Sequence, residues 1–251
     1  MAVVTGGGSG IGEALSRRLA EQGTKVAVVD LHASKAEAVA DSLPGSLAIR
    51  ADVGVEAEVR AMVDKVTTEL GPIDLYCSNA GVATGGPLGT DAEWELGWKV
   101  HVAAHVYAAR AVLADLAKRD GGAMVLTASA AGLLALTQSA PYTVTKHATV
   151  ALAEWLSIQW GDRVQFACLC PQGVQTPILG DIGPGREEVA LAGEVLQPEQ
   201  VADDVIGALD DKRFLVLPHP EVAKYESAKV ADRDRWLAVM RQVAARFRSG
   251  A

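Results

Sequence analysis

The stretch that decides the fold is Ala2-Val-Val-Thr5 followed by Gly6-Gly-Gly-Ser-Gly-Ile-Gly12. Residues 2–5 form an apolar, β-branched run typical of a buried strand, and a helical pattern begins at about residue 11. Glycines between a strand and a helix allow a tight turn and let a ligand approach the backbone. The free N–H groups and the helix dipole then favour phosphates. A glycine motif alone is a weak signal, but here its structural context is complete.

The same alternation of strand and helix continues along nearly the whole chain. The apolar runs are continuous, as expected for parallel strands covered on both faces. The expected strands are 2–5, 25–29, 47–49, 73–77, 123–127, 164–168 and 214–217. The expected helices are about 11–22, 34–42, 55–70, 92–119, 141–160 and 198–210, with a charged amphipathic C-terminal helix at about 221–247. We predict one α/β domain over residues 1–251, a doubly wound, seven-stranded parallel sheet flanked by helices.

Composition excludes several classes of protein. The 251 residues are 49% hydrophobic and 22% charged, as in a folded chain with a substantial core. The formal charge of -8 argues against a nucleic-acid partner. No apolar run approaches the ~20 residues of a membrane helix, and no signal peptide fits before the glycine cluster. The cysteines Cys77, Cys168 and Cys170 cannot form a disulfide framework. We expect a cytoplasmic protein without a membrane partner.

An acidic residue, Asp30, ends the second expected strand. Its carboxylate can accept hydrogen bonds from the adenosine ribose hydroxyls and would repel a 2′-phosphate, so we expect NAD rather than NADP. Asp52-Val53 and Asn79-Ala80-Gly81 follow the next two strands, at the same edge of the sheet. Asp52 can bond the adenine amino group while Val53 covers its ring.

Ser129, Tyr142 and Lys146 are the residues that can carry chemistry. Tyr142 and Lys146 are four residues apart, so they share one face of a helix. A free tyrosine with a pKa of about 10 is a poor base, but a nearby ammonium favours the phenolate. Ser129 can hold the substrate oxygen. The three residues predict a proton-transfer site beside a hydride acceptor.

In this order, the motifs resemble those of the short-chain dehydrogenase/reductase family over about residues 2–180. They are Thr5-Gly6-x-x-x-Gly10-x-Gly12, Asp30, Asp52, Asn79-Ala80-Gly81, Ser129, Tyr142-x-x-x-Lys146 and Pro171-x-Gly173-x-x-Thr176. The resemblance implies a Rossmann fold in which Tyr142 is the catalytic acid/base. It implies that Lys146 binds the nicotinamide ribose and lowers the Tyr142 pKa, and that Ser129 polarises the substrate carbonyl. The implied cofactor contacts are Gly6, Gly10, Ile11, Gly12, Asp30, Asp52, Val53, Asn79, Ala80, Gly81, Tyr142, Lys146, Pro171, Gly173, Val174 and Thr176.

The family resemblance also implies a homo-oligomer, a tetramer or a dimer, built on the helices expected at 92–119 and 141–160. Four tryptophans suit either the core or subunit contacts: Trp94, Trp98, Trp155 and Trp160.

Two departures from the family pattern concern the site. His101 stands where the family has an asparagine that completes a proton relay. Either its backbone carbonyl serves the relay through a water, or its imidazole takes part directly. Gln172 replaces a usual glycine or alanine and can contact substrate or nicotinamide. His105 gives a metal-like spacing with His101, but no third ligand is evident, so no metal is expected.

The irregular stretch 172–197 follows a strand and is expected to be the substrate loop. The expected substrate wall comprises Ser129, Tyr142, Val82, Ala130, Ala131, Leu133, Leu134, Gln172, Val174, Ile178 and Leu179. This wall is mainly apolar, so we predict an NAD-dependent oxidoreductase that interconverts a neutral, hydrophobic secondary alcohol and its ketone. The alternatives are an NADPH-dependent ketoreductase on acyl-carrier substrates, a catalytically silent dinucleotide-binding regulator, and a dehydratase or epimerase, whose chains usually run longer.

Overall fold

Seven parallel strands form one sheet in a computed structural model that describes residues 1–181, 187–189 and 193–248. The strands are β1 (Ala2–Thr5), β2 (Val26–Asp30), β3 (Leu47–Arg50), β4 (Leu75–Ser78), β5 (Ala123–Thr127), β6 (Gln165–Leu169) and β7 (Leu215–Val216). Their order is β3-β2-β1-β4-β5-β6-β7, which confirms the predicted doubly wound sheet. The direction of winding reverses between β1 and β4, the place where ligands bind in such sheets.

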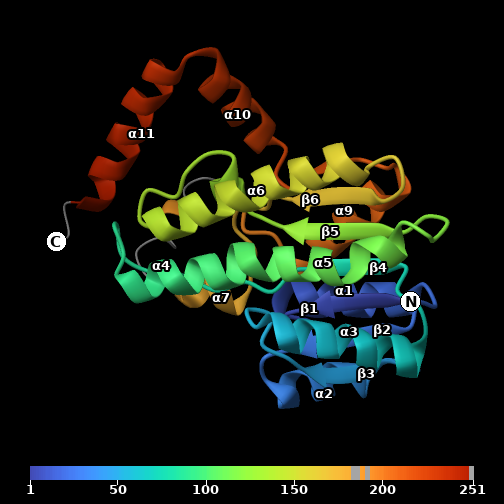
Figure 1. Cartoon of the computed structure of the whole chain (residues 1–251). Helices are drawn as coiled ribbons and strands as arrows, with labels where there is room; N and C mark the ends of the chain where they lie inside the picture. The colour runs from blue at the N-terminus through green and yellow to red at the C-terminus, as the bar shows by residue number, and fades with distance from the viewer. Residues whose placement is uncertain (182–186, 190–192, 249–251) are drawn as a thin grey trace.

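Helices cover both faces of the sheet (Figure 1). One face carries α1 (Gly10–Glu21), α2 (Ala33–Ala40) and α9 (Pro198–Asp210), and the other carries α3 (Glu56–Leu70), α5 (Ala104–Leu116) and α6 (Ala140–Trp160). Successive side chains of a strand point to opposite faces, so β1 contributes to two cores. Val3 packs with the α3, α5 and α6 side, whereas Ala2 and Val4 pack with the α1, α2 and α9 side. This double burial explains the continuous apolar runs.

The glycine turn joins β1 to α1. Gly6 and Gly10 have φ values of 63° and 53°, a region that favours glycine. A Cβ on Gly12 would lie 2.1 Å from the Gly6 carbonyl oxygen, so the helix can start this close to the turn only without a side chain.

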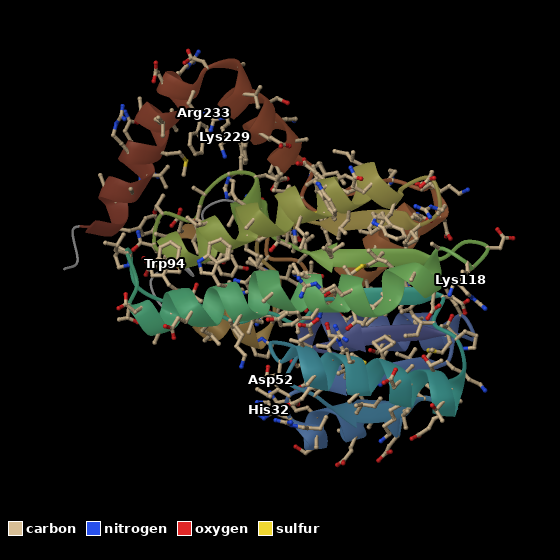
Figure 2. The ribbon with its side chains drawn as sticks, viewed as in Figure 1. His32, Asp52, Trp94, Lys118, Lys229 and Arg233 are labelled. Carbon is tan, nitrogen blue, oxygen red and sulfur yellow. The ribbon has the colours of Figure 1, made fainter. Side chains whose placement is uncertain are left out.

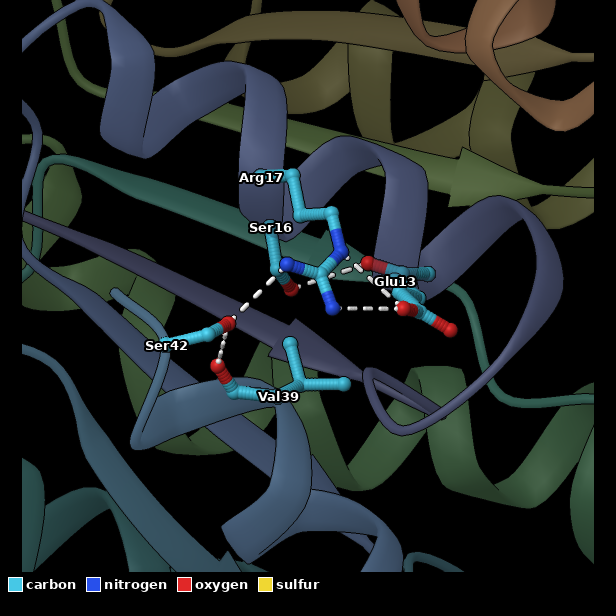
Figure 3. A network of polar contacts seen from close by, with 6 residues as sticks. Glu13, Ser16, Arg17, Val39 and Ser42 are labelled. Carbon is cyan, nitrogen blue, oxygen red and sulfur yellow. Dashed lines mark hydrogen bonds and ion pairs between the residues drawn. The ribbon is translucent and has the colours of Figure 1, made fainter.

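Arg17 anchors α1 to the end of α2 (Figure 3). Its guanidinium donates to Glu13 at 2.8 and 3.0 Å and to the Ser42 hydroxyl at 2.9 Å. Ser42 in turn donates to the Val39 carbonyl at 2.6 Å. These hydrogen bonds tie α1 to the end of α2.

The helix expected at 92–119 is interrupted. It consists of α4 (Asp91–Trp98), a π-helical turn η1 (Lys99–Ala103) and α5. Such wide turns occur mostly at functional sites. Here the turn holds His101, a residue of the predicted site.

The prediction of one C-terminal helix at 221–247 is wrong. The segment forms α10 (Glu221–Ala231) and α11 (Arg233–Arg248), separated at Asp232, whose backbone is extended. The Asp232 carboxylate accepts a hydrogen bond from the Arg235 N–H at 2.9 Å, so it starts a new helix instead of continuing the old one. The two helices form an arm that leaves the layered body (Figure 1).

The expected substrate loop contains α7 (Pro177–Asp181), and a bridge pairs Val174 with Leu196. Its Gly183, Pro184 and Gly185 lie outside the described residues. No helix among the described residues is both long and apolar enough to cross a membrane.

Three unpaired thiols lie inside the sheet. Cys77, Cys168 and Cys170 are each 0% exposed, and the Sγ atoms of Cys168 and Cys170 are 3.8 Å apart. These residues fill space in the core, as small apolar side chains do.

Candidate active site

A cavity of about 690 Å³ lies at the carboxyl ends of the strands. Most of the predicted cofactor contacts line it: Gly6, Gly10, Ile11, Asp30, Asp52, Val53, Asn79, Ala80, Gly81, Tyr142, Lys146, Pro171, Val174 and Thr176. The predicted contacts Gly12 and Gly173 do not. Gly12 is covered by Gly6, and a Cβ on Gly173 would lie 2.8 Å from Val189. Both glycines permit close packing behind the cavity wall.

The cavity has the features that a dinucleotide requires. The glycine turn presents backbone to it, since a Cβ on Gly6 would lie 2.9 Å from the Ala80 Cα and one on Gly10 would lie 2.9 Å from the Thr176 Cγ2. Neighbouring loops of the protein thus pack directly against Gly6 and Gly10, and the turn lines the cavity without side chains at these two positions. The residues present therefore fit a dinucleotide.

Asp30 is fixed at the edge of the cavity by two backbone groups. The Gly8 N–H donates to Oδ2 at 3.1 Å, and the His32 N–H donates to Oδ1 at 3.0 Å. His32, which is labelled in Figure 2, and Lys35 also line the cavity. Asp30 is only 9% exposed, so its carboxylate has a defined position from which to accept further hydrogen bonds.

Asp52 has a partner that the sequence did not indicate. Lys99, from η1, donates to Oδ2 at 2.8 Å, and the Gly54 N–H donates to Oδ1 at 2.9 Å. Burial opposes ionisation of the carboxyl, but these hydrogen bonds outweigh it and hold the Asp52 pKa below its ordinary value. Asp52, labelled in Figure 2, is therefore an ionised acceptor at the cavity wall.

Thr5 and Asn79 lock three strand ends together beneath the cavity. The Thr5 hydroxyl accepts from the Asn79 and Ala80 N–H groups at 2.9 and 3.1 Å. The Asn79 amide donates to the Thr5 carbonyl at 3.0 Å and accepts from the Thr127 hydroxyl at 3.1 Å. The polar residues at the carboxyl ends of β1, β4 and β5 thus form one rigid floor.

Ser129, Tyr142 and Lys146 come together on one wall of the cavity. Ser129 follows β5; its hydroxyl donates to the Pro171 carbonyl at 3.4 Å and lies near enough to the Tyr142 phenol to lower the Tyr142 pKa. The Lys146 Nζ lies 5.6 Å from the centre of the Tyr142 ring and donates to the Thr127 carbonyl at 3.0 Å. Since α6 begins at Ala140, Tyr142 occupies its first turn and Lys146 lies one turn later on the same face.

Burial dominates the electrostatics of this cluster. It lowers the Lys146 pKa to about 8, and it raises the Tyr142 pKa, although the Ser129 hydroxyl opposes the rise. The expected lowering of the Tyr142 pKa by Lys146 stays a prediction, and in the protein alone the net shift is upward. The reason is that desolvation penalises both charged forms, the phenolate and the ammonium.

His101 lies behind Tyr142 and is fully buried. Its ring meets the Tyr142 ring edge-on at 5.3 Å and 83°. The Nδ1 atom is 2.9 Å from the Thr145 hydroxyl, and Nε2 is 3.0 Å from the Val82 carbonyl oxygen. Burial and the nearby Lys146 hold the His101 pKa well below its ordinary value. The His101 carbonyl accepts from the Thr149 hydroxyl at 2.6 Å, so both its backbone and its side chain are engaged.

His105 is a second buried, neutral histidine. Its Nδ1 lies 2.7 Å from the Ser78 hydroxyl, and burial lowers its pKa to about 3. Its Nε2 has no hydrogen-bond partner among the described residues. Within the same residues, no group of three metal-ligating side chains is found.

The cavity is lined by every residue of the predicted substrate wall except Leu133, and by further residues that were not predicted. The predicted Val82, Ser129, Ala130, Ala131, Leu134, Tyr142, Gln172, Val174, Ile178 and Leu179 line the cavity. Leu133 does not, because its side chain turns into the hydrophobic core. Glu188 lines the cavity but was not predicted. Its carboxylate accepts from the Thr137 N–H at 2.9 Å and from the Thr137 hydroxyl at 2.7 Å, and burial raises its pKa.

The tryptophans divide between two environments. Trp160 packs against the core, whereas Trp98 and Trp155 are 44% and 56% exposed in the single chain. Of the two predicted alternatives, a core position is therefore wrong for Trp98 and Trp155, and a subunit contact stays a prediction.

Comparison with known proteins gives relatives over most of the chain. The family model "short chain dehydrogenase" matches residues 1–187. A 1-deoxy-11-beta-hydroxypentalenate dehydrogenase of Streptomyces avermitilis is 34% identical, over 88% of this chain and 84% of its own. D-threitol dehydrogenase of Mycolicibacterium smegmatis is 30% identical, over 86% and 88% of the two chains. Cyclohexanol dehydrogenase of an Acinetobacter species is 29% identical, over 86% and 90%.

Solved structures agree with this assignment. A short-chain dehydrogenase/reductase from Burkholderia phymatum, in complex with NAD, superposes with a TM-score of 0.84 at 27% identity and covers 93% of each chain. A 3-ketoacyl-(acyl-carrier-protein) reductase from Brucella melitensis, complexed with NADH, gives 0.79 at 25% identity, over 87% of this chain and 96% of its own. With a family model that spans about three quarters of its length, this chain belongs to the short-chain dehydrogenase/reductase family.

Proposed function

We propose that the protein is an NAD-dependent dehydrogenase that interconverts a secondary alcohol and a ketone. The observation that carries the proposal is the cluster of Ser129, Tyr142 and Lys146 on the wall of a cavity whose other end is formed by the glycine turn and Asp30. The dehydrogenases of hydroxypentalenate, threitol and cyclohexanol among the relatives support this reaction class.

The proposed roles follow from the positions of the hydroxyl groups. Ser129 and Tyr142 line the same cavity and their hydroxyls influence each other, so a substrate oxygen can meet both. Tyr142 exchanges the proton of that oxygen, and Ser129 orients it. Lys146, held by Thr127, presents a positive charge that stabilises the phenolate as it forms. Bound NAD would accept the hydride from the alcohol carbon.

Asp30 supports NAD over NADP. Its carboxylate faces the cavity with its position set by Gly8 and His32, and a 2′-phosphate placed there would meet a fixed negative charge. Lys35 lies at the same end and is exposed, so its charge is screened by solvent. The expected result is a much lower KM for NAD than for NADP.

A neutral, hydrophobic substrate suits the largely apolar wall. Glu188 does not change this proposal, because Thr137 already supplies hydrogen bonds to both of its oxygens. The rival, an NADPH-dependent reductase acting on an acidic acyl-carrier protein, is disfavoured by the net charge of -8.

We also propose that the chain works as a homo-oligomer, a tetramer or a dimer, in the cytoplasm. The exposed Trp155 and Ile158 on α6 and Trp98 on α4 support a subunit contact along these helices. The three unpaired cysteines are consistent with a reducing compartment.

Steady-state assays with cyclohexanol and NAD, and separately with NADP, test the proposal. Tyr142→Phe should lower turnover by about 1,000-fold, because the proton acceptor is lost, while NADH still binds. The matched control is Tyr225→Phe, at an exposed tyrosine on α10. Substantial activity in Tyr142→Phe would sink the mechanism, and a preference for NADP would overturn the role of Asp30. If a panel of secondary alcohols gave no turnover while NADH bound, the silent-regulator alternative would hold.

A further inference from the structure

Lys229 is a buried lysine that the proposed reaction does not use. It belongs to α10 and is 8% exposed, whereas Lys224 on the same helix is exposed. Figure 2 labels it on the arm, together with Arg233. Burying an ammonium is unfavourable unless its N–H groups find acceptors, so its contacts show what holds it there.

All three N–H groups of the Lys229 ammonium have an acceptor. They are the Leu133 carbonyl at 2.5 Å, the Leu134 carbonyl at 3.1 Å and the His147 Nε2 at 3.2 Å. His147 Nδ1 lies 2.8 Å from the Thr143 carbonyl, to which it donates. Nε2 is therefore left with a lone pair that can accept from the ammonium. An ammonium has three donors, so this cluster saturates it.

These acceptors belong to the substrate side of the molecule. Leu134 lines the cavity, and Leu133 immediately precedes it. Both residues follow η2 (Ala130–Gly132), whose first turn is capped by Ser129. His147 is adjacent to Lys146 on α6. Lys229 thus joins three elements that are far apart in the sequence: the arm, the wall after Ser129 and the helix of Tyr142.

Close packing limits the ways in which this wall can move. A Cβ on Gly132 would lie 2.5 Å from the Lys146 carbonyl oxygen, so the segment lies directly against α6 on one side. Lys229 holds the carbonyls of the next two residues, and its own Nζ lies 5.0 Å from the ring of Trp236 on α11. The position of the wall is therefore set jointly by α6 and by the arm.

We propose that Lys229 is a positioning residue that fixes the backbone of Leu133 and Leu134, and with it the substrate wall at Leu134, and so makes the C-terminal arm a determinant of substrate size. The proposal rests on the proposed function for its kinetic effect. Without the ammonium, two carbonyls lose their donor and the wall at Leu134 is free to shift, while Ser129, Tyr142 and Lys146 keep their other contacts. The chemical step should be little affected, and binding of a bulky alcohol should weaken.

The kinetic experiment compares wild type with Lys229→Met, Lys229→Arg and the control Lys224→Met, using cyclohexanol and 2-propanol. In Lys229→Met, the KM for cyclohexanol should rise by about fivefold, a change of the size of one ordinary hydrogen bond, with kcat within about twofold. The KM for 2-propanol should change little. Lys229→Arg should recover most of the loss, and Lys224→Met should match wild type. An unchanged cyclohexanol KM, or an equal loss with both alcohols, would overturn the proposal.

Hydrogen exchange gives a second readout that needs no turnover. Amides of residues 130–138 should exchange faster in Lys229→Met than in wild type or Lys224→Met. His147→Leu removes one acceptor without altering the arm and should give the same direction of change if Lys229→Met does not fold. If wild type oxidises no alcohol but exchange rises as expected, the proposed function fails and the positional role stands. If exchange is unchanged, the positional role fails whatever the activity.

Discussion

Lys146 is a single buried residue whose positive charge lowers the stability of the fold. Its pKa is about 8 in the folded protein, against an ordinary value of 10.5. Between these pH values the unfolded chain binds the proton and the folded chain does not, so stability rises with pH through this window. Below pH 8 the buried charge costs roughly 3 kcal/mol.

Lys146→Met should therefore raise the free energy of unfolding at pH 7 by about 1–2 kcal/mol, after loss of the hydrogen bond to Thr127, and should abolish turnover. Urea denaturation at pH 7 and pH 10 measures the effect, which should shrink at the higher pH. Lys35→Met, at an exposed lysine, is the control. A variant less stable than wild type at pH 7 would contradict this account.

His101 offers a second residue-scale prediction. Its ring nitrogens are engaged by Thr145 and Val82, and its pKa is well below the ordinary value, so it supports the Tyr142 ring and does not exchange protons near neutrality. We expect His101→Asn to lower kcat by no more than about tenfold and to keep the shape of the pH profile. If a limb of the kcat profile shifts or disappears, the imidazole takes part in the relay.

Some residues of the site could be predicted from the sequence and others could not. Tyr142 and Lys146 were found because four-residue spacing on a helix is a local signal. Glu188 and Lys229 were missed because their partners, Thr137 and Leu133, are 51 and 96 residues away, and no local pattern encodes such contacts. The inward turn of Leu133 was missed for the same reason, since either orientation suits an apolar residue.

Among the elements, the glycine turn gives the sharpest expectation. Gly12→Ala should destabilise the protein by about 3 kcal/mol and weaken NADH binding, because the new Cβ would lie 2.1 Å from the Gly6 carbonyl oxygen and push the turn away from α1. Urea denaturation and a fluorescence titration with NADH measure the two effects.

Gly23→Ala is the matched control. Gly23 has a φ of 81° but no atom within 4 Å of a Cβ, so only backbone strain of about 1 kcal/mol is expected, with NADH binding intact. Equal losses in the two variants would show that close packing at Gly12 is unimportant.

Strands and most helices followed from apolar periodicity, because each buried run carries its own local pattern. The breaks within helices did not. The π-helical turn at 99–103 lies in a continuous helical pattern in the sequence. Only the long-range contacts of Lys99 with Asp52 and of His101 with Thr145 distinguish it. In the sequence, Asp232 is compatible both with an exposed position within one helix and with the cap of a new helix. The bend of the arm was therefore not predicted.

For the whole molecule, the buried histidines His101 and His105 make the stability sensitive to acid. His105 has a pKa of about 3 in the folded protein, and that of His101 is also lowered. The unfolded chain takes up these protons below pH 6.5, whereas the folded chain does not, so stability falls as the pH drops. His105 should cost about 2 kcal/mol at pH 5, and His101 acts in the same direction.

Urea denaturation from pH 7 to pH 4.5 tests this expectation. His105→Asn should flatten the decline by about 2 kcal/mol at pH 5, whereas His32→Asn, at an exposed histidine, should follow wild type. A decline in His105→Asn as steep as in wild type would assign acid sensitivity to other groups.

The three thiols of the central sheet provide a built-in reporter of its opening. Cys77, Cys168 and Cys170 are inaccessible, and burial raises the Cys77 pKa to about 12, so an aromatic disulfide reagent in the solvent cannot reach a reactive thiolate. Labelling therefore requires the strands to separate, so the labelling rate reports how often the sheet opens. A dinucleotide that binds only the closed sheet should slow labelling in proportion to its occupancy. A simple colour change would then rank unknown ligands by affinity, before any substrate has been identified.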